Sequence, residues 1–469
     1  MGPGSEGGTV MQAAERAERA LEARRAAVVL NRRDVRAVAL TYVDNAGITR
    51  AKTVPLGRLE HAAGWGVGMS PVFDVFCVDD SITTSAHIGG PDGDLRLMPV
   101  LDRLTLLAAQ SGWAWAPVDR LTQDGEVYPG CQRSFASRMV ARAAARGIEA
   151  KMAFEVEWII GADGPDGGFV PAAPGPAYGM TRIIERSDYC RDVLAMLDRQ
   201  GVAVEQLHPE YAPGQYEVSV AASDPVGAAD VDVLVRQTVR AVGERHGVAT
   251  SFAPSVVAGE VGNGSHLHLS LWRDGRNLFT GGTGESGCTA EGESFLAGVL
   301  DRLPELVGVS APSVASYVRM APSRWAGVYQ VWGVENREAA LRIVPGTVGT
   351  RERSANAEIK CVDGSANPYL VVGSVLALGL ADLGEGRSLP PPVVGDPAGR
   401  DPAELSAAGI RRLPSSAAEA LDHLAGSGIL REAMGDPLFE AFLAVRRAEI
   451  DAAADRSPED VVAATRWRY

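Results

Sequence analysis

The side chains most able to do chemistry in this 469-residue sequence are glutamates that occur in pairs along strand-like segments. KMAFEVEWII alternates apolar and polar residues, so Glu155 and Glu157 would lie about 7 Å apart on one face of a strand. In HPEYAPGQYEVSV a Pro-Gly turn signal between Glu210 and Glu217 would bring these carboxylates near each other. Taken alone, the first pair also fits an edge strand with solvated acids, and the second fits a hairpin with outward polar residues.

Two histidines follow the glutamates in the segment GNGSHLHLSLW. His266 and His268 would share one face of a strand, which can ligate a metal but is more often structural. The preceding Gly262-Asn263-Gly264 loop lets backbone approach an anionic ligand closely, although such loops are common. Glutamates and a histidine without thiolates suit Mg²⁺ or Mn²⁺. Two such ions close together would serve phosphoryl transfer from a nucleotide.

Phosphoryl transfer also needs arginines, because a planar guanidinium grips phosphate or carboxylate with two hydrogen bonds. The segment SYVRMAPSRWAGVYQVWGVENREAALRIV supplies Arg319, Arg337 and Arg342 in apolar surroundings. An unpaired cation there is costly unless it meets an anion. Arg351 and Arg353 follow among polar residues and fit solvated side chains.

The elements that must position these residues form an α+β pattern. We expect residues 1–30 to hold a short leader and an exposed helix rich in Ala, Arg and Glu. Two β-like runs around Asn45-Ala46-Gly47 predict a hairpin within a sheet-rich N-terminal domain over 31–118. From about residue 130, helices such as RSFASRMVARAAARG alternate with short strands. This larger domain, 119–469, ends in a helical segment after a Pro/Gly-rich link.

Composition limits the partners and the compartment. The formal net charge of −14 argues against nucleic acid or an anionic membrane as the main partner. Five scattered cysteines without a CxxC pair indicate a reducing compartment and no cysteine-based zinc site. No apolar run approaches the roughly 18 residues of a membrane span, and no signal-peptide pattern is present. We therefore expect a cytoplasmic protein.

Five motifs occur in an order that resembles the glutamine synthetase superfamily: ExE, E-x6-E, GxGxHxH, SYxR…NR…R and E-x-[RK]…SANPYL. The pattern also resembles actinobacterial glutamine-synthetase-like proteins that join glutamate to polyamines or other amines. The resemblance covers nearly the whole chain. It implies a small N-terminal β-grasp domain and a larger catalytic α+β domain. It also implies a homo-oligomer, commonly of stacked hexameric rings, in which a neighbour's N-terminal domain completes each active site.

The resemblance also implies a role for individual residues. The metal nearest glutamate would be held by Glu157, Glu210 and Glu217, and the metal that holds the ATP phosphates by Glu155, His266 and Glu358. His268 and Ser270 would lie beside the nucleotide. Arg319 would grip the carboxylate of glutamate, Gly262 would touch the amino acid, and Arg337 with Arg342 would stabilise the transferring phosphate. In the family reaction, ATP phosphorylates the γ-carboxylate of glutamate and an amine then attacks the acyl phosphate.

The chain departs from ammonia-using members where ammonium would bind. Those enzymes carry a flap glutamate six residues after the arginine matched to Arg319, and here that position is Trp325. An indole cannot accept a proton from ammonium, but its face suits an alkylamine, polyamine or aromatic amine. A packing role on a mobile loop is the alternative for Trp325. Ser70 stands where those enzymes have an ammonium-binding aspartate, although Asp74 lies close enough to shift in.

Two further departures concern the phosphate and the acyl donor. Asn356 stands where the family usually has another phosphate-binding arginine. Lys360 replaces an arginine near the γ-carboxyl, which keeps the charge but loses the two-pronged grip. Both put catalytic efficiency, and glutamate as the acyl donor, in question. Acids of the N-terminal region could bind a distal amine, although nothing in their spacing demands it: Asp74, Asp79 and Asp80.

The sequence therefore predicts a ligase, dependent on ATP and on Mg²⁺ or Mn²⁺, that forms a γ-glutamyl amide from glutamate and an organic amine. An ammonia-using glutamine synthetase with a rebuilt ammonium site is the nearest alternative. A non-catalytic scaffold member of the family is another. The six predicted metal ligands argue against a scaffold, which has no reason to keep so many costly polar groups together.

Overall fold

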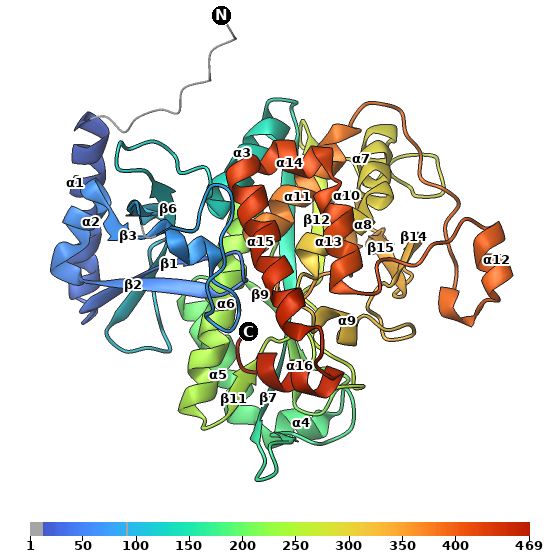
Figure 1. The fold of residues 1–469 in the computed structure, drawn as a ribbon, viewed down its shortest axis with the longest axis horizontal. Coiled ribbons are helices and arrows are strands. Elements are labelled where there is room, and N and C mark those ends of the chain that lie inside the picture. Colours follow the sequence, from blue (N-terminus) through green and yellow to red (C-terminus); the bar gives the residue numbers. More distant parts are fainter. Residues whose placement is uncertain (1–12, 91) are drawn as a thin grey trace, which may run out of the picture.

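A computed structural model of the chain describes residues 13–90 and 92–469 and arranges them around two sheets. A six-stranded sheet from the first part of the chain, blue in Figure 1, lies beside a body built on a ten-stranded sheet. Helices of the second half cover the larger sheet (Figure 1). The predicted α+β fold class is confirmed.

The first sheet holds the predicted hairpin. Its strands run β2-β1-β6-β4-β3, with β5 on β6. The bounds are β1 (Ala37–Val43), β2 (Thr49–Pro55), β3 (Val67–Met69), β4 (Leu95–Pro99), β5 (Thr105–Leu106) and β6 (Trp113–Leu121). Gly47, in the β1–β2 turn, has φ +79°, a left-handed conformation that glycine adopts at little cost. Helices α1 (Ala13–Asn31) and α2 (Leu59–Trp65) pack against each other beside the sheet.

The predicted leader, residues 1–10, and the start of the predicted helix lie outside the described residues. The remainder of that helix is α1, which is mostly exposed, as expected. The expected domain boundary at residue 118 falls inside β6. The division into an N-terminal and a catalytic domain at that residue stays a prediction.

The second sheet runs β14-β15-β16-β12-β7-β10-β9, with β8, β11 and β13 at its margins. These strands are β7 (Glu149–Asp163), β8 (Phe169–Pro171), β9 (Val204–Pro209), β10 (Gln215–Val220), β11 (Ala249–Ser251), β12 (Leu267–Arg273), β13 (Arg276–Asn277), β14 (Tyr329–Val334), β15 (Ala339–Val344) and β16 (Asn356–Ile359). Strand β7 lies between β12 and β10, so the edge-strand alternative for Glu155 and Glu157 is wrong.

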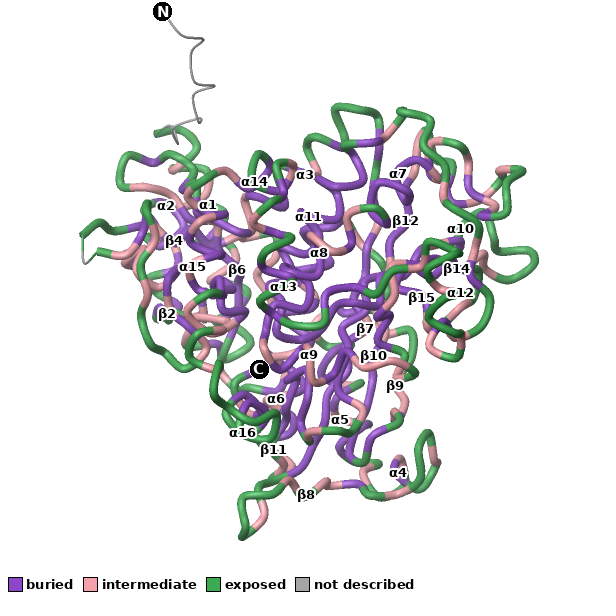
Figure 2. The backbone as a smooth tube through the Cα atoms, turned by 45° about the vertical axis from the view of Figure 1, so that its right-hand side comes forward, coloured by how far each residue is buried: buried purple, intermediate pink, exposed green. Residues whose placement is uncertain are grey.

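The helices that cover this sheet carry its core (Figure 2). The helices of this part of the chain are α3 (Gln132–Ala144), α4 (Met180–Glu185), α5 (Ser187–Arg199), α6 (Pro225–Arg245), α7 (Ala290–Asp301), α8 (Leu303–Ser310), α9 (Ser316–Arg319), α10 (Arg351–Ser354), which has no buried residue, and α11 (Pro368–Ala381). Helix α11 is buried along nearly its whole length. Its glycines permit this, because a Cβ at Gly373 would come within 2.4 Å of the ring of Phe135 and one at Gly379 within 2.3 Å of Phe295.

The predicted C-terminal helical segment consists of α12 (Pro402–Ala407), α13 (Ala417–Ala425), α14 (Gly428–Met434), α15 (Asp436–Ala453) and α16 (Pro458–Thr465). No helix in residues 13–90 and 92–469 is both long and apolar enough to cross a membrane. All five cysteines are buried free thiols, in line with the expected lack of a disulfide framework.

The β1–β2 turn docks on the larger part of the chain. The side-chain amide of Asn367, which also caps α11, donates to the carbonyls of Val43 at 2.9 Å and Asp44 at 3.1 Å. Arg446 of α15 donates to the carbonyl of Asn45. A Cβ at Gly47 would lie 2.1 Å from the carbonyl oxygen of Ser365, so only glycine fits this approach. The two sheets are thus fixed to each other through the hairpin turn.

Candidate active site

A pocket of about 570 Å³ opens over one face of the ten-stranded sheet and gathers most of the predicted site residues. Those that line it are Glu155, Glu157, Glu210, Glu217, Gly262, His266, Arg319, Trp325, Arg337, Arg342 and Lys360. Tyr178, Gln206, His208, Val261 and Arg324 also line it, and the sequence analysis did not single them out. Residues from distant parts of the chain therefore meet in one hollow that holds both carboxylates and cations.

Strand register explains why the carboxylates meet. Glu217 on β10 lies directly opposite Glu157 on β7 and His208 on β9. On the other side of β7, His268 on β12 lies opposite Glu358 on β16. Residues opposite each other project to the same face, where their side chains come within reach of one another. Opposed like charges such as Glu157 and Glu217 destabilise a sheet unless a cation lies between them.

One group of ligand atoms, here called the β9 cluster, consists of His208, Glu210 and Glu217. His208 Nε2 lies 3.1 Å from Glu217 and its Nδ1 lies 3.5 Å from Glu210. The hydrogen bond to Glu217 raises the pKa of His208 to about 9. Burial, together with the neighbouring charges of Glu155 and Glu157, raises the pKa of Glu217 to about 7. His208 was missed, although its place two residues before Glu210 was a usable signal.

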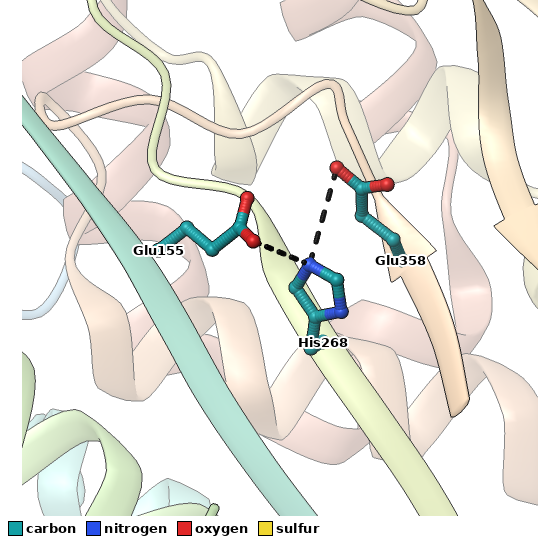
Figure 3. A group of neighbouring side chains, drawn as sticks. All are labelled: Glu155, His268 and Glu358. Atoms are coloured by element: carbon teal, nitrogen blue, oxygen red, sulfur yellow. Dashed lines mark ion pairs between the residues drawn. The ribbon is translucent and has the colours of Figure 1, made fainter. Parts of the chain in front are cut away.

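A second group, here called the β12 cluster, consists of Glu155, His268 and Glu358, and Figure 3 shows them converging from three strands. His268 Nε2 lies 3.2 Å from Glu155 and 4.0 Å from Glu358. Burial alone would lower the pKa of His268, but the hydrogen bond with Glu155 and the nearby acids raise it to about 9. Asn356 Oδ1 lies 2.8 Å from His268 Nδ1, which turns Nε2 toward the carboxylates.

His266 also adjoins the β12 cluster. Its Nδ1 lies 3.4 Å from Glu155 and 3.4 Å from Glu358. Burial and the charge of Lys360 lower the pKa of His266, which favours the neutral ring that can ligate a metal. The donors of both clusters are carboxylate oxygens and imidazole nitrogens, the set expected for Mg²⁺ or Mn²⁺.

Cations compensate Glu358. Lys360 Nζ donates to its carboxylate at 2.7 Å and Arg342 donates at 3.0 Å. Burial would raise the pKa of Glu358, but the charges of Lys360, His268 and His266 together outweigh it and hold that pKa below its usual value. Lys360, expected near the γ-carboxyl of glutamate, is therefore paired with a predicted metal ligand in this structure. Arg337 lines the pocket and is exposed.

The glycine loop and Arg319 form the wall beside Glu157. The backbone N–H of Gly264 donates to Glu157 at 2.9 Å. A Cβ at Gly262 would lie 1.8 Å from the carbonyl oxygen of Pro254, so this position tolerates only glycine. Arg319 is buried, and its Nη1 has no hydrogen-bond partner among the described residues. A buried, unsatisfied guanidinium nitrogen fits an anionic substrate group.

Trp325 lies at the mouth of the pocket. Its ring is 38% exposed, and its centroid lies 5.2 Å from that of Tyr211. Its backbone N–H donates to Glu338 at 3.0 Å, and the hydroxyl of Ser323 in the same loop donates to Asp396 at 2.6 Å. Trp325 therefore lines the pocket while it is partly exposed and in contact with Tyr211.

Four predicted residues do not line the pocket: His268 and Glu358 of the β12 cluster, Ser270 and Ser70. Ser270 follows His268 along β12 and accepts a hydrogen bond from Trp272 Nε1 at 2.9 Å. Ser70 lies in the N-terminal part of the chain, where its hydroxyl accepts a hydrogen bond from the backbone N–H of Val72 at 3.3 Å and caps a short helical turn. A contribution of Ser70 to a site would have to reach the pocket of a neighbouring subunit.

The N-terminal acids considered for a distal amine are engaged within the chain. Asp74 is fully buried, and Arg120 donates to it at 2.8 Å. Asp80 pairs with Arg50 and Arg468, each at 2.9 Å. Asp79 accepts hydrogen bonds from the backbone and hydroxyl of Ser81. Burial and ion pairing, neither visible in sequence spacing, explain why Asp74 is not available to an amine.

The fold and pocket are those of a glutamine synthetase, and the chain belongs to this family: the model for glutamine synthetase, catalytic domain, matches residues 129–462. It is 57% identical over 437 residues to the gamma-glutamylpolyamine synthetase GlnA3 of Streptomyces coelicolor, covering 93% of this chain and 94% of the relative. It is 28% identical over 439 residues to the glutamine synthetase of Pyrococcus abyssi, covering 92% and 94%.

Solved structures agree with this assignment. The crystal structure of a novel glutamine synthase homolog superposes with a TM-score of 0.83 at 31% identity, over 93% of this chain and 99% of that one. A GmaS/ADP complex superposes with a TM-score of 0.79 at 25% identity, over 92% and 96%. The predicted family, fold class and enzyme class, an ATP-dependent ligase, are confirmed. Enzymes of this family use ATP and divalent metal ions.

Proposed function

We propose that this protein joins the γ-carboxyl group of glutamate to an organic amine, with a polyamine as the favoured amine. The observation that carries the proposal is Trp325 in the lining of a pocket that also holds four carboxylates, at the position where, by the family resemblance, ammonia-using members place a carboxylate. An indole over carboxylates attracts an alkylammonium through its apolar surface and its π face. The relative named a gamma-glutamylpolyamine synthetase supports the same choice of amine.

Glutamate would bind beside the glycine loop. Arg319 offers a buried Nη1 without a partner among the described residues, which suits the α-carboxylate. Glu157, held by the N–H of Gly264, would face the α-amino group together with the backbone of Gly262. This orientation directs the γ-carboxyl toward the arginines across the pocket.

The phosphate would bind where the cations gather. Arg337, Arg342 and Lys360 line the pocket and would neutralise the γ-carboxylate and the transferring phosphoryl group. His268, oriented by Asn356, and Ser270 would lie on the nucleotide side. Mg²⁺ or Mn²⁺, held by Glu157, Glu210 and Glu217 and by Glu155, His266 and Glu358, would supply Lewis-acid stabilisation of the phosphate charge.

The amine would enter past Trp325, which lines the pocket and contacts Tyr211. It must lose a proton before it attacks the acyl phosphate, and an indole cannot take that proton. A pocket carboxylate has to receive it, and Glu210, the neighbour of Tyr211, is suitably placed. We also propose that subunits assemble into rings, stacked as dodecamers, in which Ser70 of one subunit faces the pocket of another.

An amine panel tests this proposal. Purified protein with glutamate, ATP and Mg²⁺ is given ammonia, monoamines, diamines or longer polyamines, and the glutamyl product is identified by mass. We expect the highest kcat/KM with a diamine or polyamine. Turnover with ammonia alone would instead support an ordinary glutamine synthetase. No phosphate release with any amine would favour a scaffold or another acyl donor.

A further inference from the structure

A second hollow, of about 230 Å³, adjoins the active-site pocket. It is here called the side groove, and it is lined by Ile159, Phe169, Pro171, Ala212, Pro213, Val257, Glu260 and Val261. Its floor is apolar, because Ile159, Ala212 and Val256 form a buried cluster against which Phe169 and Val261 pack. Glu260 is the single charged residue in its lining.

The side groove continues the pocket along three chain segments. Val261 lines both hollows, with Gly262 on the pocket side and Glu260 on the groove side. On β7, Glu157 lines the pocket and Ile159 the groove, about 7 Å further along the same face. After β9, Glu210 lines the pocket and Ala212 the groove. An extended ligand that lies at Glu210 can therefore continue into the side groove beside Ala212.

The charge of Glu260 is not used by the protein itself. Glu260 is exposed, and its carboxylate makes no ion pair or hydrogen bond with the described residues. Arg466, which lies 5.7 Å from the ring of the groove residue Phe169, is already engaged: it donates to Asp163 at 2.9 Å and to the carbonyl of Val256 at 2.9 Å. The groove thus combines an apolar floor with one free carboxylate.

That combination matches the part of a polyamine that does not react. Such a molecule alternates methylene chains, which gain from apolar contact, with ammonium groups, which need an anion. We propose that the side groove is the subsite for the distal aminoalkyl arm of the amine substrate, with Glu260 binding its ammonium. This assignment rests on the proposed function and names the residue that would distinguish diamines from monoamines.

The test compares Glu260→Gln with wild-type protein on matched amines. The probes are a linear diamine and a monoamine of the same chain length, each with saturating glutamate and ATP. We expect Glu260→Gln to raise the KM for the diamine about threefold to tenfold and to leave the KM for the monoamine and the kcat for both unchanged. Glu285→Gln, which removes an exposed loop carboxylate from outside both hollows, is the matched control.

A second variant guards against a local distortion. Val257 lines the groove at 38% exposure, so Val257→Lys places a cation opposite the arm without disturbing the core. It should raise the KM for the diamine at least as much as Glu260→Gln does. If the wild-type protein turns over diamines and neither variant changes the KM for the diamine, the groove assignment is wrong but the proposed function stands. Wild-type protein without turnover on any organic amine overturns the proposed function, and the groove assignment with it.

Discussion

The β9 cluster lines the pocket and the β12 cluster adjoins it through Glu155, but the charges of the two clusters are balanced differently. In the β12 cluster, Glu358 receives hydrogen bonds from Lys360 and Arg342, and His268 pairs with Glu155. In the β9 cluster, the ion pairs that Glu210 and Glu217 make with the described residues are both with His208. Accordingly, the pKa of Glu358 lies below its usual value, whereas burial raises the pKa of Glu217 to about 7.

This difference in charge balance suits the two clusters to different ligands. The β12 cluster already contains the positive charge that a phosphate needs, so its carboxylates stay ionised without help. In the β9 cluster two carboxylates share the single partner His208, and a bound cation would relieve the excess negative charge. This contrast agrees with placing the phosphate at the first cluster and a metal ion with the amine near the second.

The largest expected effect comes from removing a ligand of the β12 side. Glu155→Ala and His266→Ala should each lower kcat by about 1,000-fold or more, because phosphoryl transfer loses its charge stabilisation. Phosphate release under saturating glutamate, amine and Mg²⁺ measures this. Glu149→Ala, at the exposed start of the same strand β7, is the control and should retain activity. Near-normal rates in Glu155→Ala would contradict the placement of the transferred phosphate beside the β12 cluster.

The next largest effect concerns the free energy of unfolding, which should change in opposite directions when a carboxylate is removed from the β12 cluster or from the β9 cluster. Without metal at pH 8, Glu358→Gln should lower the free energy of unfolding by about 3 kcal/mol, because it leaves Lys360 and Arg342 without their buried partner. Glu217→Gln should raise it by about 1 kcal/mol, because it removes a buried charge opposite Glu157. Urea denaturation with EDTA measures both.

The pH dependence of Glu217→Gln follows from the direction of the pKa shift. A carboxyl whose folded-state pKa is raised from 4.5 to about 7 makes the folded state less stable as pH rises between those values. The gain in Glu217→Gln should therefore be full above pH 7 and vanish near pH 4.5. A destabilised Glu217→Gln protein at pH 8 would show that the two clusters do not differ as described.

The smallest expected effect concerns the amine. Trp325→Glu should raise the ammonia-dependent kcat/KM by about tenfold, because it restores a proton acceptor at the pocket mouth. Trp325→Phe keeps a ring without an acceptor and should leave the ammonia rate unchanged. Steady-state rates with ammonia and with a polyamine measure both variants. An amine preference that Trp325→Glu does not alter would mean that position 325 does not select the amine.

The sequence predicted correctly those site residues whose spacing along one strand or around one turn determines which side chains lie together. Glu155 and Glu157 alternate with apolar residues on a strand, and Glu210 and Glu217 flank a turn, so local geometry places each pair. Contacts that depend on strand order or on burial could not be predicted from the sequence. The pairing of Lys360 with Glu358 and the burial of Asp74 against Arg120 need the assembled sheets. The contribution of His208 needed β9 beside β10.

The loop that carries Trp325 is stabilised by hydrogen bonds to residues outside the loop. Ser323 and Trp325 have φ +58° and +55°, left-handed conformations that cost a non-glycine residue about 1–2 kcal/mol each. Glu338 binds the backbone of Trp325 and Asp396 binds the hydroxyl of Ser323, and neither contact uses the indole. Evolution can therefore exchange the side chain at position 325 without rebuilding the loop. A lineage could diversify the nucleophiles it accepts while its phosphorylating machinery stays constant.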